Sequence, residues 1–117
     1  RDTPSSLIVD NQNNLLLFGS STSTNFPVTD NAYDPVFSGI SDIILVKFNE
    51  EGSDLIGSTY IGGSENDGFN TIVIDGPDLY YNYGDDSRGE VMLDDSGNIY
   101  VASVTESSNF PTTPGVM

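Results

Sequence analysis

Short apolar runs separated by clusters of Gly, Pro, Asn and Asp extend along the whole chain, and no segment shows sustained helical periodicity. Runs rich in β-branched and aromatic residues and bounded by turn-forming residues are typical of β-strands. Strands are expected at residues 7–9, 15–19, 42–48, 55–61, 71–74, 79–83 and 90–93 and from residue 99. Residues 1–6 are expected to form a lead-in loop. The pattern therefore predicts an all-β chain of antiparallel strands.

One hairpin signal occurs twice. The stretch Asp94 to Val101 joins two apolar runs through an acidic turn, and a rougher copy lies at Asp10 to Leu17. Asp, Asn and Gly suit such turns because they tolerate left-handed backbone, and Asp and Asn also hydrogen-bond locally. Over residues 10–29, an offset of 84 makes seven of 20 positions identical. The repeat indicates that the chain uses one hairpin unit twice.

The repeat continues into the loop that follows each hairpin. The block Asn-Phe-Pro recurs in register, and its aromatic members, Phe26 and Phe110, are expected to be packing anchors between repeats. A single sheet cannot bury both of its faces, whereas copies stacked around an axis bury them and protect the strand edges. The repeat is therefore predicted to form β-propeller blades.

Several motifs together resemble the bacterial β-propeller repeat family called SBBP. They are Val91 to Val101 with Asn109 to Gly115, Asp42 to Phe48 with Gly52-Ser53, and Ser58 to Ser64. The departures are Asn13, where the turn usually has Gly, and residues 76–88, which look like an insertion. The resemblance implies a propeller of secreted or surface-exposed bacterial proteins. Members in Bacteroidetes often carry type IX secretion sorting domains and are associated with gliding motility or adhesion. The family offers no common catalytic residues.

The expected strands make about one and a half blades. Residues 1–63 are predicted to be a first blade with its lead-in, residues 64–89 a connecting loop with inserted strands, and residues 90–117 the first hairpin and loop of the next blade. A propeller needs at least about four blades to close. The chain is therefore interpreted as a fragment of a larger propeller whose open edges pair with missing neighbours or with another chain.

Composition narrows the classes of function. The 117 residues contain 3 Lys and Arg against 18 Asp and Glu, a net charge of -15, which repels phosphate backbones and anionic lipid. Nucleic-acid binding is therefore not expected. The absence of Cys excludes disulfides and thiolate metal sites, and the absence of His removes the usual catalytic base and the commonest zinc ligand. The longest apolar runs are about four residues, so direct membrane insertion is not expected.

Two acidic loops make calcium the candidate ligand, and no other cofactor is expected. Hard oxygens occur at Asp94, Asp95 and Asn98 in one loop and at Glu65 and Asp67 in another, and calcium prefers such oxygens. The alternative is that these residue types are simply good turn formers. The turn is the favoured interpretation, because the earlier copy of the first loop has no counterpart of Asp95 and because the spaced carboxylates of an EF-hand are missing.

Catalysis is not expected. Glu65, Asp67 and Glu90 could in principle supply the carboxylate pair of a glycoside hydrolase. With 18 acidic residues in the chain, however, some pairs will lie at suitable separations by chance. The sequence contains no phosphate loop, nucleophile elbow or basic patch.

Two further features bear on binding. Tyr80, Tyr81 and Tyr83 could form an aromatic platform for a sugar or a protein partner, and the competing interpretation is a strand that covers the propeller rim. Lys47 lies inside an expected strand, so it should point to solvent or pair with an acid.

Together these features predict a non-catalytic structural or interaction module. It would be part of an exported bacterial β-propeller, secreted or at the cell surface, that presents loops to a protein or glycan partner. The partners would be the remaining blades or another cell-surface protein. Two alternatives stay open: a calcium-stabilised carbohydrate-binding or adhesin module, and the propeller portion of a secreted hydrolase.

Overall fold

The computed structural model of the chain describes residues 1–69 and 89–116. The described residues form six strands in two antiparallel sheets and contain no helix. The first sheet consists of β1 (Asp2–Val9), β2 (Leu15–Ser21), β3 (Asp42–Phe48) and β4 (Leu55–Ile61). The second consists of β5 (Gly89–Leu93) and β6 (Ile99–Ser103). The predicted all-β class is confirmed. Within the described ranges, no helix is long and apolar enough to cross a membrane.

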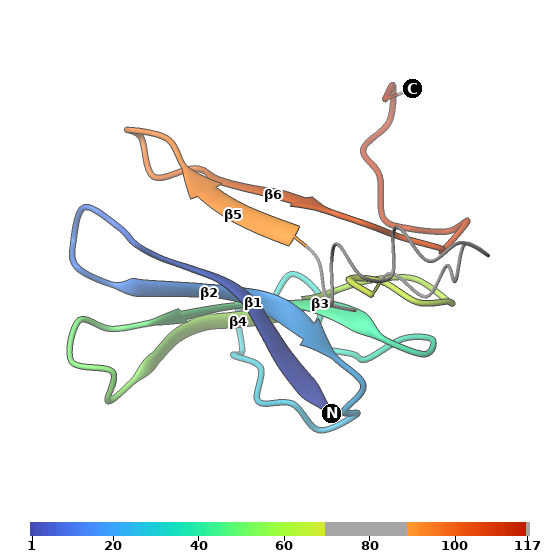
Figure 1. Cartoon of the computed structure of the whole chain (residues 1–117), viewed down its shortest axis with the longest axis horizontal. Coiled ribbons are helices and arrows are strands. Elements are labelled where there is room, and N and C mark those ends of the chain that lie inside the picture. The colour runs from blue at the N-terminus through green and yellow to red at the C-terminus, as the bar shows by residue number, and fades with distance from the viewer. Residues whose placement is uncertain (70–88, 117) are drawn as a thin grey trace, which may run out of the picture.

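The first sheet is a simple meander in the order β1-β2-β3-β4. The β5–β6 hairpin lies over it as a second layer, with β5 packed against β1 and β2 (Figure 1). The turns of all three hairpins lie at the same end of the molecule, on the left of Figure 1. The architecture therefore brings segments far apart in sequence together at this end.

The strand bounds agree with the sequence pattern for β3 and β4 but not for β1. The expected loop at residues 1–6 is wrong, because Asp2, Thr3 and Pro4 pair with β2 and extend β1 to Asp2. Pro4 is tolerated because β1 is an edge strand with a register shift just after it. The strands expected at residues 71–74 and 79–83 and the insertion at residues 76–88 lie outside the described residues.

Alternation along the strands gives the first sheet two apolar faces. The upper face, which points to the second sheet, carries Ile8, Leu16, Phe18 and Ile43. These residues cluster with the inner face of the second sheet, formed by Val91, Leu93 and Val101. Phe110 packs against the same cluster, which confirms that it is a packing anchor between the repeats. The core of the described structure therefore lies between the two sheets.

The lower face of the first sheet carries Leu7, Val9, Leu17 and Val46. Tyr60 lies on the same face and attaches the loop of residues 22–41 to β4. The buried Tyr60 ring meets the rings of Phe26 and Phe37 edge-on, at centroid distances of 6.2 and 5.8 Å. Its hydroxyl donates to the Ser23 carbonyl at 2.7 Å and accepts the Phe26 N–H at 3.0 Å. Phe26 is therefore anchored on its own sheet.

Candidate functional site

The turns of the β1–β2 and β5–β6 hairpins are each built around one aspartate. Asp10 Oδ1 accepts the N–H groups of Gln12 and Asn14 at 2.8 and 2.9 Å. Asp94 Oδ1 accepts the two equivalent N–H groups at 2.9 and 2.8 Å. The side-chain amides of Asn14 and Asn98 donate to the second oxygen of the same aspartates, at 3.1 and 2.7 Å. The two turns are thus the same structure at an offset of 84 residues.

The backbone explains why the first copy works without glycine. Asn13 has a φ of 63°, and its equivalent Gly97 has a φ of 82°. Asn is one of the few residues other than Gly that adopts this left-handed conformation at small cost. A third turn follows β3, where Asn49 Oδ1 accepts two backbone N–H groups at 2.9 and 3.0 Å. The turn therefore forms with Asn at position 13 in the first copy as it does with Gly at position 97 in the second.

Local hydrogen bonds set the ionisation of both turn aspartates. The Lys47 ammonium lies 2.6 Å from Asp10 Oδ2 and holds the pKa of that carboxyl well below its usual range. The expected pairing of Lys47 with an acid is confirmed. The side-chain amide of Asn98, followed by its backbone N–H, lowers the pKa of Asp94. Both carboxylates are therefore ionised at neutral pH and committed to local contacts.

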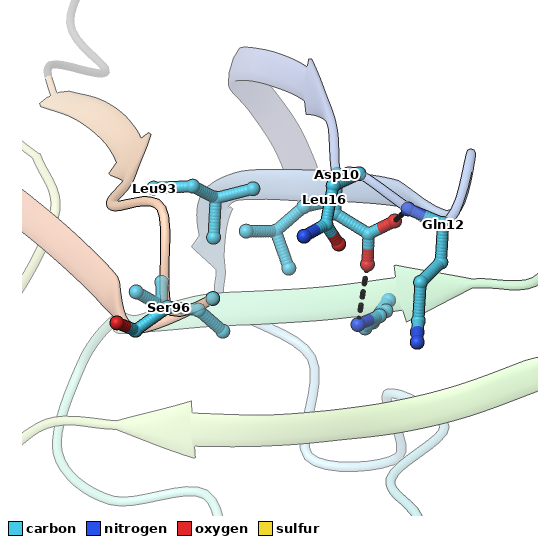
Figure 2. Close-up of a pocket in the computed structure, with 9 residues that line it drawn as sticks. Asp10, Gln12, Leu16, Leu93 and Ser96 are labelled. Carbon is cyan, nitrogen blue, oxygen red and sulfur yellow. Dashed lines mark hydrogen bonds and ion pairs between the residues drawn. The ribbon is translucent and has the colours of Figure 1, made fainter.

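A pocket of about 310 Å³ lies between these two turns. Asp10, Gln12 and Leu16 of the first sheet face Leu93 and Ser96 of the second across this space (Figure 2). Lys47 also lines it. The lining combines an ion pair and turn polar groups with aliphatic side chains, which suits a small group that has both polar and apolar surface.

Asp67 joins the two sheets at the other end of β6. Its carboxylate accepts the hydroxyl of Thr105, the hydroxyl of Ser107 at 2.9 Å and the Gly63 N–H at 2.6 Å. Its own N–H donates to the Ser41 carbonyl at 2.9 Å. Asp67 is fully buried, so these bonds offset the cost of removing its charge from water. The carboxylate of Asp67 therefore links the end of β4 to the segment after β6, and its backbone adds the start of β3.

Asp2 makes the same kind of link in the first repeat. It accepts the hydroxyls of Ser21 and Ser23, which are equivalent to Thr105 and Ser107 at the offset of 84. The Ser21 bond lowers the pKa of Asp2. Sequence reasoning missed that Asp67 takes the role of Asp2, although a signal exists. Residues 2–10 and 67–75 both begin and end with Asp and share three successive aliphatic positions, at an offset of 65.

Asp42, which begins β3, was also missed. Its Oδ2 accepts the Ser38 N–H at 2.7 Å, whereas its buried Oδ1 has no hydrogen-bond partner in the described part of the chain. A Cβ placed on Gly62 would lie 2.1 Å from Asp42 Oδ1 and 3.0 Å from Asp67 Oδ2, so the two carboxylates approach each other here. Burial raises the pKa of Asp42 to about 6, and the Asp67 charge adds to this effect.

The residues considered for calcium fall into two separate groups. Asp94, Asp95 and Asn98 lie on the exposed turn before β6, whereas Glu65 and Asp67 lie at the joint beyond its other end. The structure therefore does not bring the two groups together. In the described ranges, no three His, Cys, Asp or Glu side chains form a group that could hold a metal ion.

The remaining candidate residues are dispersed. Glu90, considered with Glu65 and Asp67 for catalysis, lies on β5 and accepts the Ser6 hydroxyl at 3.2 Å. Tyr80, Tyr81 and Tyr83 lie outside the described residues.

Comparison of the chain with protein-family models, with curated proteins and with solved structures finds no match. The resemblance to the SBBP family therefore stays a prediction that rests on the sequence motifs.

Proposed function

We propose that this chain is a non-catalytic structural and interaction module, part of an exported bacterial β-propeller that is secreted or held at the cell surface. The observation that carries the proposal is the repetition of one hairpin in two stacked sheets. The pair Leu7–Leu17 in the first hairpin and the pair Val91–Val101 in the second occupy equivalent positions at an offset of 84. Repeat proteins build large binding surfaces by stacking such units.

The use of the acidic side chains also favours a structural role. Asp10 and Asp94 hold turns, and Asp2 and Asp67 hold strand ends. The hydrogen-bond donors around Asp2, Asp10 and Asp94 lower the pKa of these three carboxyls, which suits structure better than general-acid catalysis. The net charge of -15 would keep a large exported protein soluble.

The pocket between the turns is the place where we expect a protein loop or a glycan to bind. The side chains of Gln12, Lys47 and Ser96 offer polar groups, and Leu16 and Leu93 offer an apolar surface. Its position at the exposed end of two repeats leaves it accessible to a large partner.

Extension of the chain by further repeats tests the proposal. Residues 34–117 form one 84-residue unit that can be added after Met117 without a change of offset. We expect each added unit to raise the Tm by at least about 2 °C, because each adds a sheet-to-sheet interface. The matched control carries Val91→Lys in the added unit, since the equivalent position of the existing interface is buried between the two sheets. A Tm that does not depend on the number of units would refute the proposal.

A further inference from the structure

The packing between the two sheets identifies a pair of complementary faces. The upper face of the first sheet, with Ile8 and Leu16, packs against the inner face of the second sheet, with Val91 and Leu93 (Figure 1). By the offset of 84, Val91 and Leu93 are equivalent to Leu7 and Val9, which lie on the lower face of the first sheet. The lower face of one unit is therefore the surface that packs on the upper face of the unit before it.

Part of each of these faces is uncovered; on the lower face it is the part along β1, since Ile44, Val46 and Tyr60 farther across that face are buried. Val91 is 2% exposed, whereas its equivalent Leu7 is 57% exposed and the neighbouring Val9 is 59% exposed. On the other side, Leu16 is 2% exposed, whereas its equivalent Tyr100 is 54% exposed. Met92, the equivalent of Ile8, is 63% exposed. The two exposed apolar faces are thus the two halves of an interface that the chain already contains.

We propose that the chain stacks head to tail on a second copy of itself, with Leu7 and Val9 of one copy packed on Met92 and Tyr100 of the next. This inference rests on the proposed function and assigns the surfaces through which the units meet. The contacts reproduce those that Val91 and Leu93 make with the upper face of the first sheet. Because the two faces differ, the contact is heterologous, and each dimer keeps one free face of each kind.

The small residues at the existing interface support this choice of occupant. Gly89 lies against the Phe18 ring, where a Cβ would approach a ring carbon to 2.3 Å. By the offset, these two residues correspond to Ser5 and Ala102 in the proposed contact, and Ser5 lies at the register shift of β1. Because Ala102 is much smaller than Phe18, the outer face of the second sheet has room there for a residue larger than glycine. The close approach that requires Gly89 in the existing interface therefore has no counterpart in the proposed one.

Self-association can be measured by sedimentation velocity from about 10 µM to about 1 mM. The buffer contains about 0.5 M NaCl, which screens the repulsion between chains of charge -15. We expect the average mass of the wild type to rise with concentration. Leu7→Lys and Tyr100→Lys should each stay monomeric, because each blocks one face. Because lysine reduces the net negative charge, a loss of self-association in these variants cannot come from stronger charge repulsion between the chains.

An equimolar mixture of the two variants is the decisive sample. Leu7→Lys keeps a working outer face on the second sheet, and Tyr100→Lys keeps a working lower face, so together they should form a dimer and nothing larger. Tyr100→Phe, which keeps the ring, should associate as the wild type does. Val9→Lys provides a second block of the lower face if circular dichroism shows that Leu7→Lys is unfolded.

Three results would overturn the inference: a wild type that is monomeric throughout, single variants that assemble as the wild type does, or a mixture without dimer. A failure here is distinguishable from failure of the proposed function. If added units raise the Tm of the extended chain while separate chains stay monomeric, stacking within one chain stands and association between copies is wrong.

Discussion

Two aspartate environments in the described structure set opposite dependences on pH. Asp10 and Asp94 sit in turns where several donors stabilise the ionised form. Asp42 is buried with one oxygen unpartnered in the described structure. Only the last arrangement favours the neutral acid at a pH near neutrality.

We predict that Asp42 destabilises the fold as the pH rises. Its pKa is raised from 3.8 to about 6, so stability is unaffected below pH 3.8, falls as the pH rises from 3.8 to about 6, and levels off above that. Reduced for solvent screening, the loss between pH 4 and pH 7 should be roughly 1–2 kcal/mol. Urea unfolding at a series of pH values measures it.

The control for this prediction is Asp42→Asn. An amide can still accept the Ser38 N–H and places an N–H₂ group where the unpartnered oxygen lies. Its stability should exceed that of the wild type at pH 7 and approach it as the pH falls to about 4. The lowered pKa values of Asp2, Asp10 and Asp94 affect the free energy of unfolding at lower pH than the titration of Asp42 does, and they are shared by both proteins. Parallel curves for the two proteins would show that Asp42 is not the titrating group.

A second prediction concerns the left-handed position of the β5–β6 turn. Gly97 has a φ of 82° and open space around it, so Gly97→Ala introduces backbone strain without a steric clash. We expect a loss of about 1 kcal/mol in the free energy of unfolding. Gly57→Ala on β4 is the matched control, because Gly57 also has open space but no positive φ. Equal effects of the two substitutions would rule out strain as the cause.

At the scale of elements, the sequence predicts a strand well where the strand carries its own hydrophobic pattern. The apolar runs of β3 and β4 are bounded by clear turn residues, and their bounds agree with the structure. The first half of β1 is polar, so nothing in residues 1–6 indicates a strand. These residues are ordered by pairing with Gly19 to Ser21, a contact that no local pattern reveals.

The candidate site follows the same rule. The Asp10 and Asp94 turns were predictable because each aspartate accepts N–H groups that lie within five residues of it, although the Lys47 ammonium and the Tyr100 hydroxyl come from neighbouring strands. The role of Asp67 was not, because its partners come from three segments, at Ser41, Gly63 and residues 105–107. The Ser38 bond of Asp42 is local, but the burial of Asp42 and its approach to Asp67 arise only after distant segments pack. The offset of 84 also placed Asp86 rather than Asp67 opposite Asp2. Local chemistry is thus visible in the sequence, and contacts between distant segments are not.

The two aspartate-centred turns give a prediction about elements. Asp10→Ala removes the turn hydrogen bonds and also leaves Lys47 without its carboxylate partner, whereas Asp94→Ala removes turn hydrogen bonds and the bond from the Tyr100 hydroxyl at 3.2 Å but breaks no ion pair. Both variants should melt below the wild type, and Asp10→Ala should have the lower Tm. The difference between the Tm values of the two variants should be smaller in high salt, which weakens the ion pair between Lys47 and Asp10. Identical melting temperatures for the two variants would mean that the ion pair contributes nothing.

At the scale of the whole molecule, the two sheets are held together at three places along β5 and β6. Asp67 links them beyond β6, the apolar cluster fills the middle, and Gly89 allows β5 to approach Phe18. The contact at Gly89 has no room to adjust, since a Cβ there would also lie 2.7 Å from the Ala102 carbonyl oxygen. The second sheet has only two described strands, so its order depends on this packing.

We therefore predict that Gly89→Val separates the sheets without unfolding the first. Amide hydrogen exchange should lose protection at Val91 and Val101 while β2 and β3 stay protected, because the four-stranded sheet keeps its lower-face contacts with Tyr60. Adding Phe18→Leu, which shortens the opposing side chain, should restore part of the protection in the second sheet, and a double-mutant cycle measures the coupling. Uniform loss of protection in both sheets would show instead that they unfold as one cooperative unit. Stacking of repeats, within one chain or between copies, depends on sheets that are individually stable and closely fitted, and this experiment separates these two properties.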